Sequence, residues 1–174
     1  MKLSILGVFF LLLFSCAQQG SKKMDTPIYF DLAKYFEGEA ARLQKTDPTI
    51  IKGVIVVGKS EQLSTKITDW KTELASFSNA DINKTSWKGE FAETNHNGNL
   101  SYTSSNPKIP IKKIEIVKFN NQIKSIKIFK ATENYLYTST DTLLYYPDSL
   151  YFIQNSQNIK LLGEKKYQVT GKFN

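Results

Sequence analysis

The chain contains one cysteine, Cys16, and one histidine, His96, among its 174 residues. Ser-His-Asp and Cys-His catalysis both need a histidine as base, so either would have to use His96. That histidine lies beside Asn97-Gly98, a dipeptide typical of a tight hairpin turn, where we expect a solvated side chain. A single cysteine excludes an intrachain disulfide and a zinc site of several Cys and His ligands. We therefore expect no catalytic residue of these classes, no metal ligand and no cofactor site.

Residues 53–60 read G-V-I-V-V-G-K-S and match the G-x₄-G-K-[ST] pattern of phosphate-binding P-loops. A P-loop needs a strand before the motif and a loop whose backbone N–H groups point at phosphate. Here the four middle residues are Val and Ile, whose branched side chains favour extended backbone. We predict a buried strand over residues 50–57 that ends in a turn at Gly58-Lys59-Ser60-Glu61, and no nucleotide site.

Carboxylate pairs are the remaining catalytic possibility. Two carboxyl groups that face each other across a cleft can act as general acid and as base or nucleophile. The spacing along the chain marks no two of them as partners, so a carboxylate-dependent periplasmic hydrolase stays open as the alternative function. The candidates are Asp31, Glu37, Glu39, Glu73, Asp141 and Asp148.

Aromatic residues crowd into residues 135–152. Alternation along a strand places Tyr135 and Tyr137 on one face, and the adjacent Tyr145 and Tyr146 on opposite faces. Packing within a sheet is the commoner use of such rings, and a recognition surface is the other. Asp141-Thr142-Leu143 and Asp148-Ser149-Leu150 resemble the Asp-Ser/Thr-aliphatic sites of O-glycosylation in exported Bacteroidota proteins, and Tyr146-Pro147-Asp148-Ser149 predicts a type I turn.

The first sixteen residues carry an export pattern. Residues 5–14 are apolar and would span only ~15 Å as a helix, which is typical of a secretory signal peptide. Leu13-Phe14-Ser15-Cys16 resembles the bacterial lipobox. That resemblance implies that residues 1–15 are removed and that Cys16 is the lipid attachment site, with diacylglycerol on the thiol and an acyl chain such as palmitate on the new amino group. Cleavage after Ala17 of an ordinary signal peptide is the alternative.

Residues 16–26 have the composition of a flexible tether, and their reach is at most ~34 Å. No cluster of Asp and Glu follows Cys16, as it does in Bacteroidota lipoproteins that are sorted to the cell exterior. The resemblance therefore implies a protein of the cell envelope, anchored in the membrane through lipid, on the periplasmic face of the outer membrane.

The positive charge does not predict nucleic-acid binding. The net charge is +7, or +6 once Lys2 is removed with the signal. Every cation except Arg42 is a lysine, and the lysines are spread along the chain instead of forming one stripe. Arginine is the residue suited to bidentate contacts with phosphates and bases, so we expect no nucleic-acid partner.

The first half of the body predicts two helices and a hairpin. Thr26-Pro27 has the residue types of a helix start, and Asp47-Pro48 those of a helix end. The strand over residues 50–57 has a possible partner over residues 63–67, and Thr68 or Asp69 can cap a shorter second helix. One face of the first helix would carry Tyr29, Leu32, Ala33, Phe36, Ala40 and Leu43, and one face of the second Trp70, Leu74 and Phe77.

The second half predicts a meander of strands. Asn97-Gly98 would join strands over residues 87–94 and 100–104. Around Asn120-Asn121, a loop with an odd number of residues pairs Ile116 with Ile126, Ile114 with Ile128 and Glu115 with Lys127, which matches apolar with apolar and opposite charges. The last strand would place Tyr167, Val169 and Phe173 on one face, and Lys166, Gln168, Thr170 and Lys172 on the other.

These elements predict an α+β domain over residues 27–174, with one or two N-terminal helices packed on one face of a curved, mostly antiparallel meander sheet. Residues 112–173 resemble uncharacterised small lipoproteins of Bacteroidota, through the stretch Tyr-Tyr-Pro-Asp-Ser-Leu-Tyr at residues 145–151. That family has no established activity. We expect a non-enzymatic binding or assembly module that holds a lipid, a glycan or a protein partner.

Overall fold

The computed structural model describes residues 26–56 and 58–174. The expected signal peptide over residues 1–15, the lipid attachment site Cys16 and nearly all of the tether lie outside these residues. Within the described ranges, no helix is both long and apolar enough to cross a membrane.

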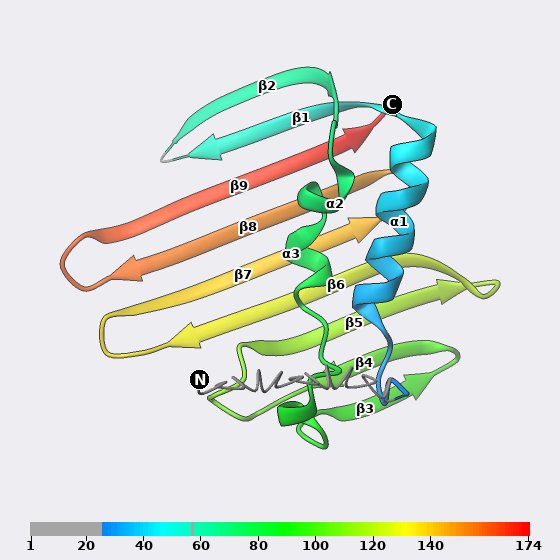
Figure 1. The fold of residues 1–174 in the computed structure, drawn as a ribbon. Coiled ribbons are helices and arrows are strands. Elements are labelled where there is room, and N and C mark those ends of the chain that lie inside the picture. The colour runs from blue at the N-terminus through cyan, green and yellow to red at the C-terminus, as the bar shows by residue number, and fades with distance from the viewer. Residues whose placement is uncertain (1–25, 57) are drawn as a thin grey trace, which may run out of the picture.

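One nine-stranded antiparallel sheet dominates the molecule (Figure 1). The spatial order is β2-β1-β9-β8-β7-β6-β5-β4-β3, so β3 to β9 form a meander and the β1–β2 hairpin joins it at the far side of β9. The strands are β1 (Thr49–Val56), β2 (Lys59–Lys66), β3 (Ala92–His96), β4 (Asn99–Thr103), β5 (Ile111–Phe119), β6 (Gln122–Glu133), β7 (Tyr137–Tyr146), β8 (Leu150–Ile159) and β9 (Gly163–Phe173).

The helices lie on one face of this sheet, as predicted (Figure 1). They are α1 (Leu32–Thr46), α2 (Trp70–Glu73), α3 (Ala75–Ser78) and the 3₁₀ turn η1 (Thr85–Trp87). The predicted α+β class fits in its coarse form, but among the helices of residues 26–56 and 58–174 only α1 is longer than about one turn. The expected second helix is divided at Leu74, whose backbone (φ −92°, ψ 6°) leaves the helical range between α2 and α3.

The predicted start of the first helix at Thr26-Pro27 is wrong. The helix begins at Leu32, and the Asp31 carboxylate caps it by accepting a 2.8 Å hydrogen bond from the Lys34 N–H. Tyr29 is still buried, although it lies before the helix. Asn83 Oδ1 accepts hydrogen bonds from the N–H groups of Ile28 and Tyr29 at 3.0 and 2.9 Å. A side chain distant in sequence therefore holds this segment outside the helix.

The core lies between α1, α2 and α3 and the facing side of the sheet. The buried helix residues are Leu32, Phe36, Ala40 and Leu43 of α1, with Trp70, Leu74 and Phe77 of the second helical region. Ala33 is exposed, contrary to the predicted face. It follows Leu32 directly and so lies about 100° away from it around the helix. The predicted end is confirmed, since Asp47 takes a left-handed conformation (φ 45°) before Pro48.

The predicted register of the β5–β6 hairpin is confirmed in all three pairs: Ile116 with Ile126, Ile114 with Ile128 and Glu115 with Lys127. The loop itself differs from the expected odd-numbered one. Phe119 pairs with Gln122 across a two-residue turn, and a bulge at Lys124 supplies the odd residue. Asn120 and Asn121 have φ of 50° and 59°, as a type I′ turn requires.

The first half of the P-loop match, residues 53–56, lies in strand β1, as predicted, but only Ile50 of that strand is fully buried and residue 57 lies outside the described residues. Val54, Ile55 and Val56 of β1 pair with both β9 and β2, so their backbone groups are used in the sheet. Gly58 has a positive φ of 78°, and β2 already begins at Lys59, so the turn expected over residues 58–61 is too long and the partner strand expected over residues 63–67 covers residues 59–66. This conformation cannot cradle a phosphate.

Two smaller predictions need correction. The strand expected over residues 87–94 begins only at Ala92, because Trp87 ends a 3₁₀ turn and Gly89 has a φ of 81°. The turn at Tyr146 has the expected 3.1 Å hydrogen bond from the Ser149 N–H to the Tyr146 carbonyl. Its third residue, Asp148, has a φ of 56°, which belongs to a type II turn and not to type I.

Candidate functional site

The aromatic cluster over residues 135–152 divides between the core and the surface. Tyr145 of β7 and Tyr151 of β8 are directly opposite each other and fully buried beneath the helices. Tyr146 is 40% exposed, on the face opposite its neighbour Tyr145, as alternation predicted. Tyr135 is exposed in the β6–β7 turn and not in a strand, so the predicted alternation does not apply to it and Tyr137. Tyr145 and Tyr151 therefore serve as core packing, whereas the other rings of the cluster are partly or largely exposed.

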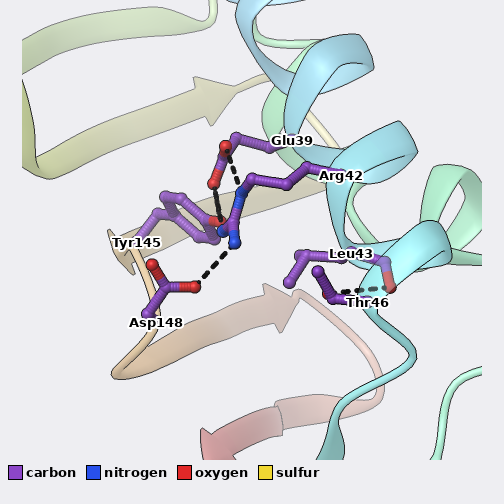
Figure 2. Close-up of polar contacts among 6 residues, drawn as sticks. All are labelled: Glu39, Arg42, Leu43, Thr46, Tyr145 and Asp148. Atoms are coloured by element: carbon purple, nitrogen blue, oxygen red, sulfur yellow. Dashed lines mark hydrogen bonds and ion pairs between the residues drawn. The ribbon is translucent and has the colours of Figure 1, made fainter.

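A polar network joins α1 to the sheet (Figure 2). The Tyr145 hydroxyl donates a 2.6 Å hydrogen bond to Glu39 Oε2. Arg42 donates to both oxygens of the same carboxylate at 2.9 Å, from Nε and Nη2. Its remaining nitrogen, Nη1, lies 2.8 Å from Asp148 Oδ1 in the β7–β8 turn. All three guanidinium nitrogens therefore contact carboxylates of the protein itself.

Titration in this network follows from burial and from the hydrogen bonds. Burial by itself would raise the pKa of Glu39, but hydrogen bonds from Arg42 and Tyr145 outweigh it and the net pKa is lowered. Burial first, and then the bond to Glu39, raise the pKa of Tyr145 far above its usual range. At neutral pH the pair is therefore an ionised carboxylate and a neutral phenol that donates to it.

A second tyrosine–glutamate pair lies beside the first. The Tyr151 hydroxyl donates a 2.5 Å hydrogen bond to Glu73 Oε1 in α2, and Lys52 Nζ of β1 lies 2.7 Å from Glu73 Oε2. Burial and the bond to Glu73 raise the pKa of Tyr151 in the same way. Each helical region is thus attached to the middle of the sheet by one phenol, one carboxylate and one cation.

These networks leave no titratable side chain of their own free for catalysis. A small cavity of about 380 Å³ lies against Glu39, Arg42 and Asp148. Glu39 cannot act as a general acid at neutral pH because its pKa is lowered. The Arg42 guanidinium, fully occupied by two carboxylates, is not free to bind an anion. The arrangement is suited to holding α1 on the sheet.

The other predicted carboxylates also have local roles. Asp31 caps α1, and Glu37 is exposed on the same helix. Asp141 lies 2.8 Å from Lys130 Nζ and accepts a hydrogen bond from Asn155, which also donates to Ser139 at 3.0 Å. Over residues 26–56 and 58–174, no group of three or more His, Cys, Asp or Glu side chains is placed to hold a metal ion. His96 ends β3 and is exposed.

The face of the sheet opposite the helices, called here the open face, carries apolar side chains. Since Tyr145 is buried beneath the helices, its neighbours Leu144 and Tyr146 point to the open face. No described helix lies on this face (Figure 1). Val117, Phe129 and Tyr146 are 42%, 39% and 40% exposed on it, and Leu144 and Phe152 are partly buried between its polar residues. Charged residues surround Phe129 and Val117, since Lys113 is opposite Phe129 and Glu115 is opposite Lys127. Uncharged polar residues occupy the strands further along, among them Thr140, Thr142, Gln154, Gln168 and Thr170.

Sequence reasoning missed the partners of the two buried tyrosines. Glu39 and Glu73 appeared only as possible members of a catalytic pair, and Arg42 only as the exception among the lysines. A usable signal did exist, because Glu39 and Arg42 are three residues apart on a helix, where opposite charges pair. The contact with Tyr145 has no such signal.

Comparisons with known proteins give no further assignment. No family model matches the chain, and neither a curated protein nor a solved structure matches it significantly.

Proposed function

We propose that this protein is a non-enzymatic binding module of the bacterial cell envelope, anchored to the membrane through lipid on Cys16. The resemblance of Leu13-Phe14-Ser15-Cys16 to a lipobox supports the anchor. We place the anchored domain on the periplasmic face of the outer membrane. Two or three acyl chains hold a protein on a bilayer almost permanently, so the folded domain would act close to that surface.

The observation that carries the binding role is the open face. A sheet that carries helices on one side only leaves its other side in contact with solvent, and here that side holds Val117, Phe129 and Tyr146 at about two-fifths exposure. Partly exposed aromatic side chains among polar and charged ones suit contact with a glycan, a lipid or a protein. We propose the open face as the binding surface.

The titratable groups support a binding role over a hydrolytic one. The Glu39 and Glu73 carboxylates beneath the helices are each already bound by a cation and a phenol. A two-carboxylate hydrolase needs one carboxyl group with a raised pKa, whereas the pKa of Glu39 is lowered.

The anchor is tested by a substitution at its single cysteine. Cells are fed a fatty acid with an alkyne tag, and the protein is examined for the tag and for its presence in the membrane fraction. We expect Cys16→Ser to lose the tag completely and Ser15→Ala, which keeps a small residue before the cysteine, to retain it. A Cys16→Ser chain that still carries the tag would contradict the proposal.

The binding surface is tested by native mass spectrometry of protein purified from membranes. We expect a bound species on the parent chain, and its loss in Phe129→Glu on the open face. Lys34→Glu is the matched control, because Lys34 is exposed on α1, on the other side of the sheet. If the parent chain carries no bound species, or if both variants behave alike, the open face is not the binding surface.

A further inference from the structure

Two neighbouring hairpin turns carry the four most exposed large apolar side chains of the described chain. Leu161 and Leu162 in the β8–β9 turn are 95% and 68% exposed, and Tyr135 and Leu136 in the β6–β7 turn are 83% and 66% exposed. Both turns project from the same end of the sheet, away from α1 (Figure 1). We call these four residues the tip patch.

The tip patch is built by specific contacts between the two turns. The Lys160 N–H donates a 3.2 Å hydrogen bond to the Leu136 carbonyl, and Lys160 Nζ lies 3.8 Å from the centre of the Tyr135 ring. Asn134 Oδ1 accepts hydrogen bonds from the Leu136 and Tyr137 N–H groups at 2.8 and 3.0 Å. The two turns therefore present their apolar side chains together, as one surface at the end of the sheet.

The core does not account for these side chains. The strands that lead to the turns are polar or exposed near their ends, so the tip patch is separate from the buried cluster beneath the helices. Exposure of the adjacent Leu161 and Leu162 side chains to water costs free energy, and burial against another surface would recover it.

The charges beside the tip patch indicate what that surface is. Lys160, Lys165 and Lys166 are within a few residues of Leu161 and Leu162, and their cationic ends can reach anionic headgroups while the stems lie along apolar chains. The acidic neighbours are Glu133 and Glu164. Glu164 pairs with Lys166 at 3.1 Å and accepts a hydrogen bond from Ser156, so these two charges cancel. Lys160 and Lys165 then remain against Glu133 alone, which gives this end a net charge of +1.

We propose that the tip patch inserts into the interfacial region of a bilayer that contains anionic phospholipid. Leu136, Leu161 and Leu162 enter the acyl boundary, the Tyr135 ring lies at headgroup level, and Lys160 and Lys165 contact phosphates. This proposal rests on the proposed function insofar as the anchor on Cys16 brings the domain to the membrane.

The first experiment measures the environment of the tip in the anchored protein. The chain carrying Leu161→Cys is purified from membranes, its acylation at Cys16 is verified by mass, and an environment-sensitive fluorophore is attached to the new thiol. The protein is placed in vesicles of phosphatidylethanolamine and phosphatidylglycerol. We expect a blue shift and strong quenching by lipid-attached quenchers, and neither effect for Leu63→Cys, a control position that is 56% exposed in the edge strand β2.

Each outcome has one meaning. An acylated protein whose label at position 161 stays in a water-like environment overturns the tip proposal and leaves the anchor intact. A blue shift that depends on protein concentration and not on vesicles shows a second copy as the occupant, which also overturns it. Absence of acylation contradicts the proposed function alone.

A second experiment removes the dependence on the anchor. The mature-length chain with Cys16→Ser is mixed with the same vesicles and sedimented. We expect salt-sensitive binding that falls about tenfold or more when Leu161→Ser and Leu162→Ser are combined. The control pair Leu63→Ser and Phe119→Ser, which changes two exposed side chains elsewhere, should bind as the parent does. Equal binding by both double variants would overturn the proposal.

Discussion

Tyr145 and Tyr151 show how single side chains attach helices to this sheet. They are cross-strand neighbours on β7 and β8, yet one donates to Glu39 in α1 and the other to Glu73 in α2. A hydrogen bond to an ionised acceptor is stronger than one between neutral groups, and here the rings are buried. These two contacts therefore fix which part of the sheet each helix covers.

Removal of the Tyr145 hydroxyl should destabilise the fold measurably. Tyr145→Phe leaves the Glu39 carboxylate with one fewer donor, and we expect the free energy of unfolding to fall by about 1–3 kcal/mol. Chemical denaturation followed by circular dichroism measures this. Tyr146→Phe, one residue away on the open face, is the control and should change stability by less than about 0.5 kcal/mol. Equal effects of the two substitutions would show that the bond to Glu39 contributes nothing.

Glu39 should make stability sensitive to acid. Its pKa in the fold is below the ordinary 4.5, so its contribution is complete above about pH 4.5 and is lost as the pH falls through the lowered folded value. We expect Glu39→Gln to be less stable than the parent at neutral pH and to lose less stability on acidification. Unfolding curves measured at several pH values between 3 and 7 test this, with Glu37→Gln on the exposed side of α1 as control. Parallel curves for the parent chain and Glu39→Gln would refute the assignment.

At this scale the sequence predicted residue types better than partners. The division of Tyr145 and Tyr146 between two faces follows from strand alternation, which is local. The bond from Tyr145 to Glu39 joins residues 106 positions apart, and no local pattern encodes it. The same holds for Asn83, which holds the segment before α1 through contacts 54 and 55 positions away.

Strand β9 has a glycine, Gly171, where the Tyr151 ring of the neighbouring strand β8 packs against it. A Cβ atom added to Gly171 would lie 2.1 Å from two ring carbons of Tyr151, so the ring lies flat over this glycine. Trp70 and Phe173 stack beside it with centres 5.7 Å apart. Gly171 is therefore required by close packing and not by its backbone angles.

Gly171→Ala should be strongly destabilising. The methyl group would push the buried Tyr151 ring off its site, and we expect a loss of about 1–3 kcal/mol or more in the free energy of unfolding. Gly53→Ala in β1 is the matched control, because its added Cβ would come no closer than 3.9 Å to any neighbour. Denaturation of both variants, and of Gly171→Ala combined with Tyr151→Leu, tests the cause. The double variant should cost less than the sum of the two single changes.

The β5–β6 hairpin separates what the sequence determines from what it leaves open. The register follows from two kinds of matching across the hairpin: Ile114 and Ile116 face Ile128 and Ile126, and Glu115 faces Lys127. A slip of one residue would turn the buried isoleucines to solvent. The same matching is satisfied by an odd-numbered loop or by a two-residue turn with a bulge, so it could not distinguish them. The structure uses the second solution, with Lys124 as the bulged residue.

Substitution of Asn121 should reveal the type I′ turn. Its φ of 59° suits glycine, so we expect Asn121→Gly to leave stability unchanged or raise it by a few tenths of a kcal/mol. Asn121→Val should lower it by about 1–2 kcal/mol, because a β-branched residue resists the left-handed conformation. Gln122→Val, at the next exposed position but within the strand, is the control. Thermal unfolding distinguishes the three variants. If Asn121→Val proves as stable as Gln122→Val, the turn is of another type.

At the scale of the whole molecule, the arrangement of β1 was the main feature that the sequence did not predict. The meander from β3 to β9 follows chain order, which short turns enforce. β1 instead pairs with β9, eight strands later in the chain, and the fit of Ile50, Val54 and Val169 into a common core favours that partner. The sequence also predicted a longer second helix than the structure has, because the region after Asp69 forms two four-residue helices that are divided at Leu74.

This pairing predicts that the β1–β2 hairpin and the meander unfold together. Val169 is buried in β9, which bonds to β1 on one side and β8 on the other. We expect Val169→Ala to lower the free energy of unfolding by about 1–3 kcal/mol and to speed amide exchange equally in β1 and β8. Gln168→Ala, on the other face of the same strand, is the control. Exchange that accelerates in only one of the two strands would show two separate units.

The position of β9 has a consequence for synthesis. As the chain leaves the ribosome, β1 emerges long before the strand beside which it belongs, and the β1–β2 hairpin by itself has too little apolar surface to remain folded. The complete sheet can close only once β9 has appeared. The β1–β2 hairpin should therefore remain without its neighbouring strand until β9 has been synthesised.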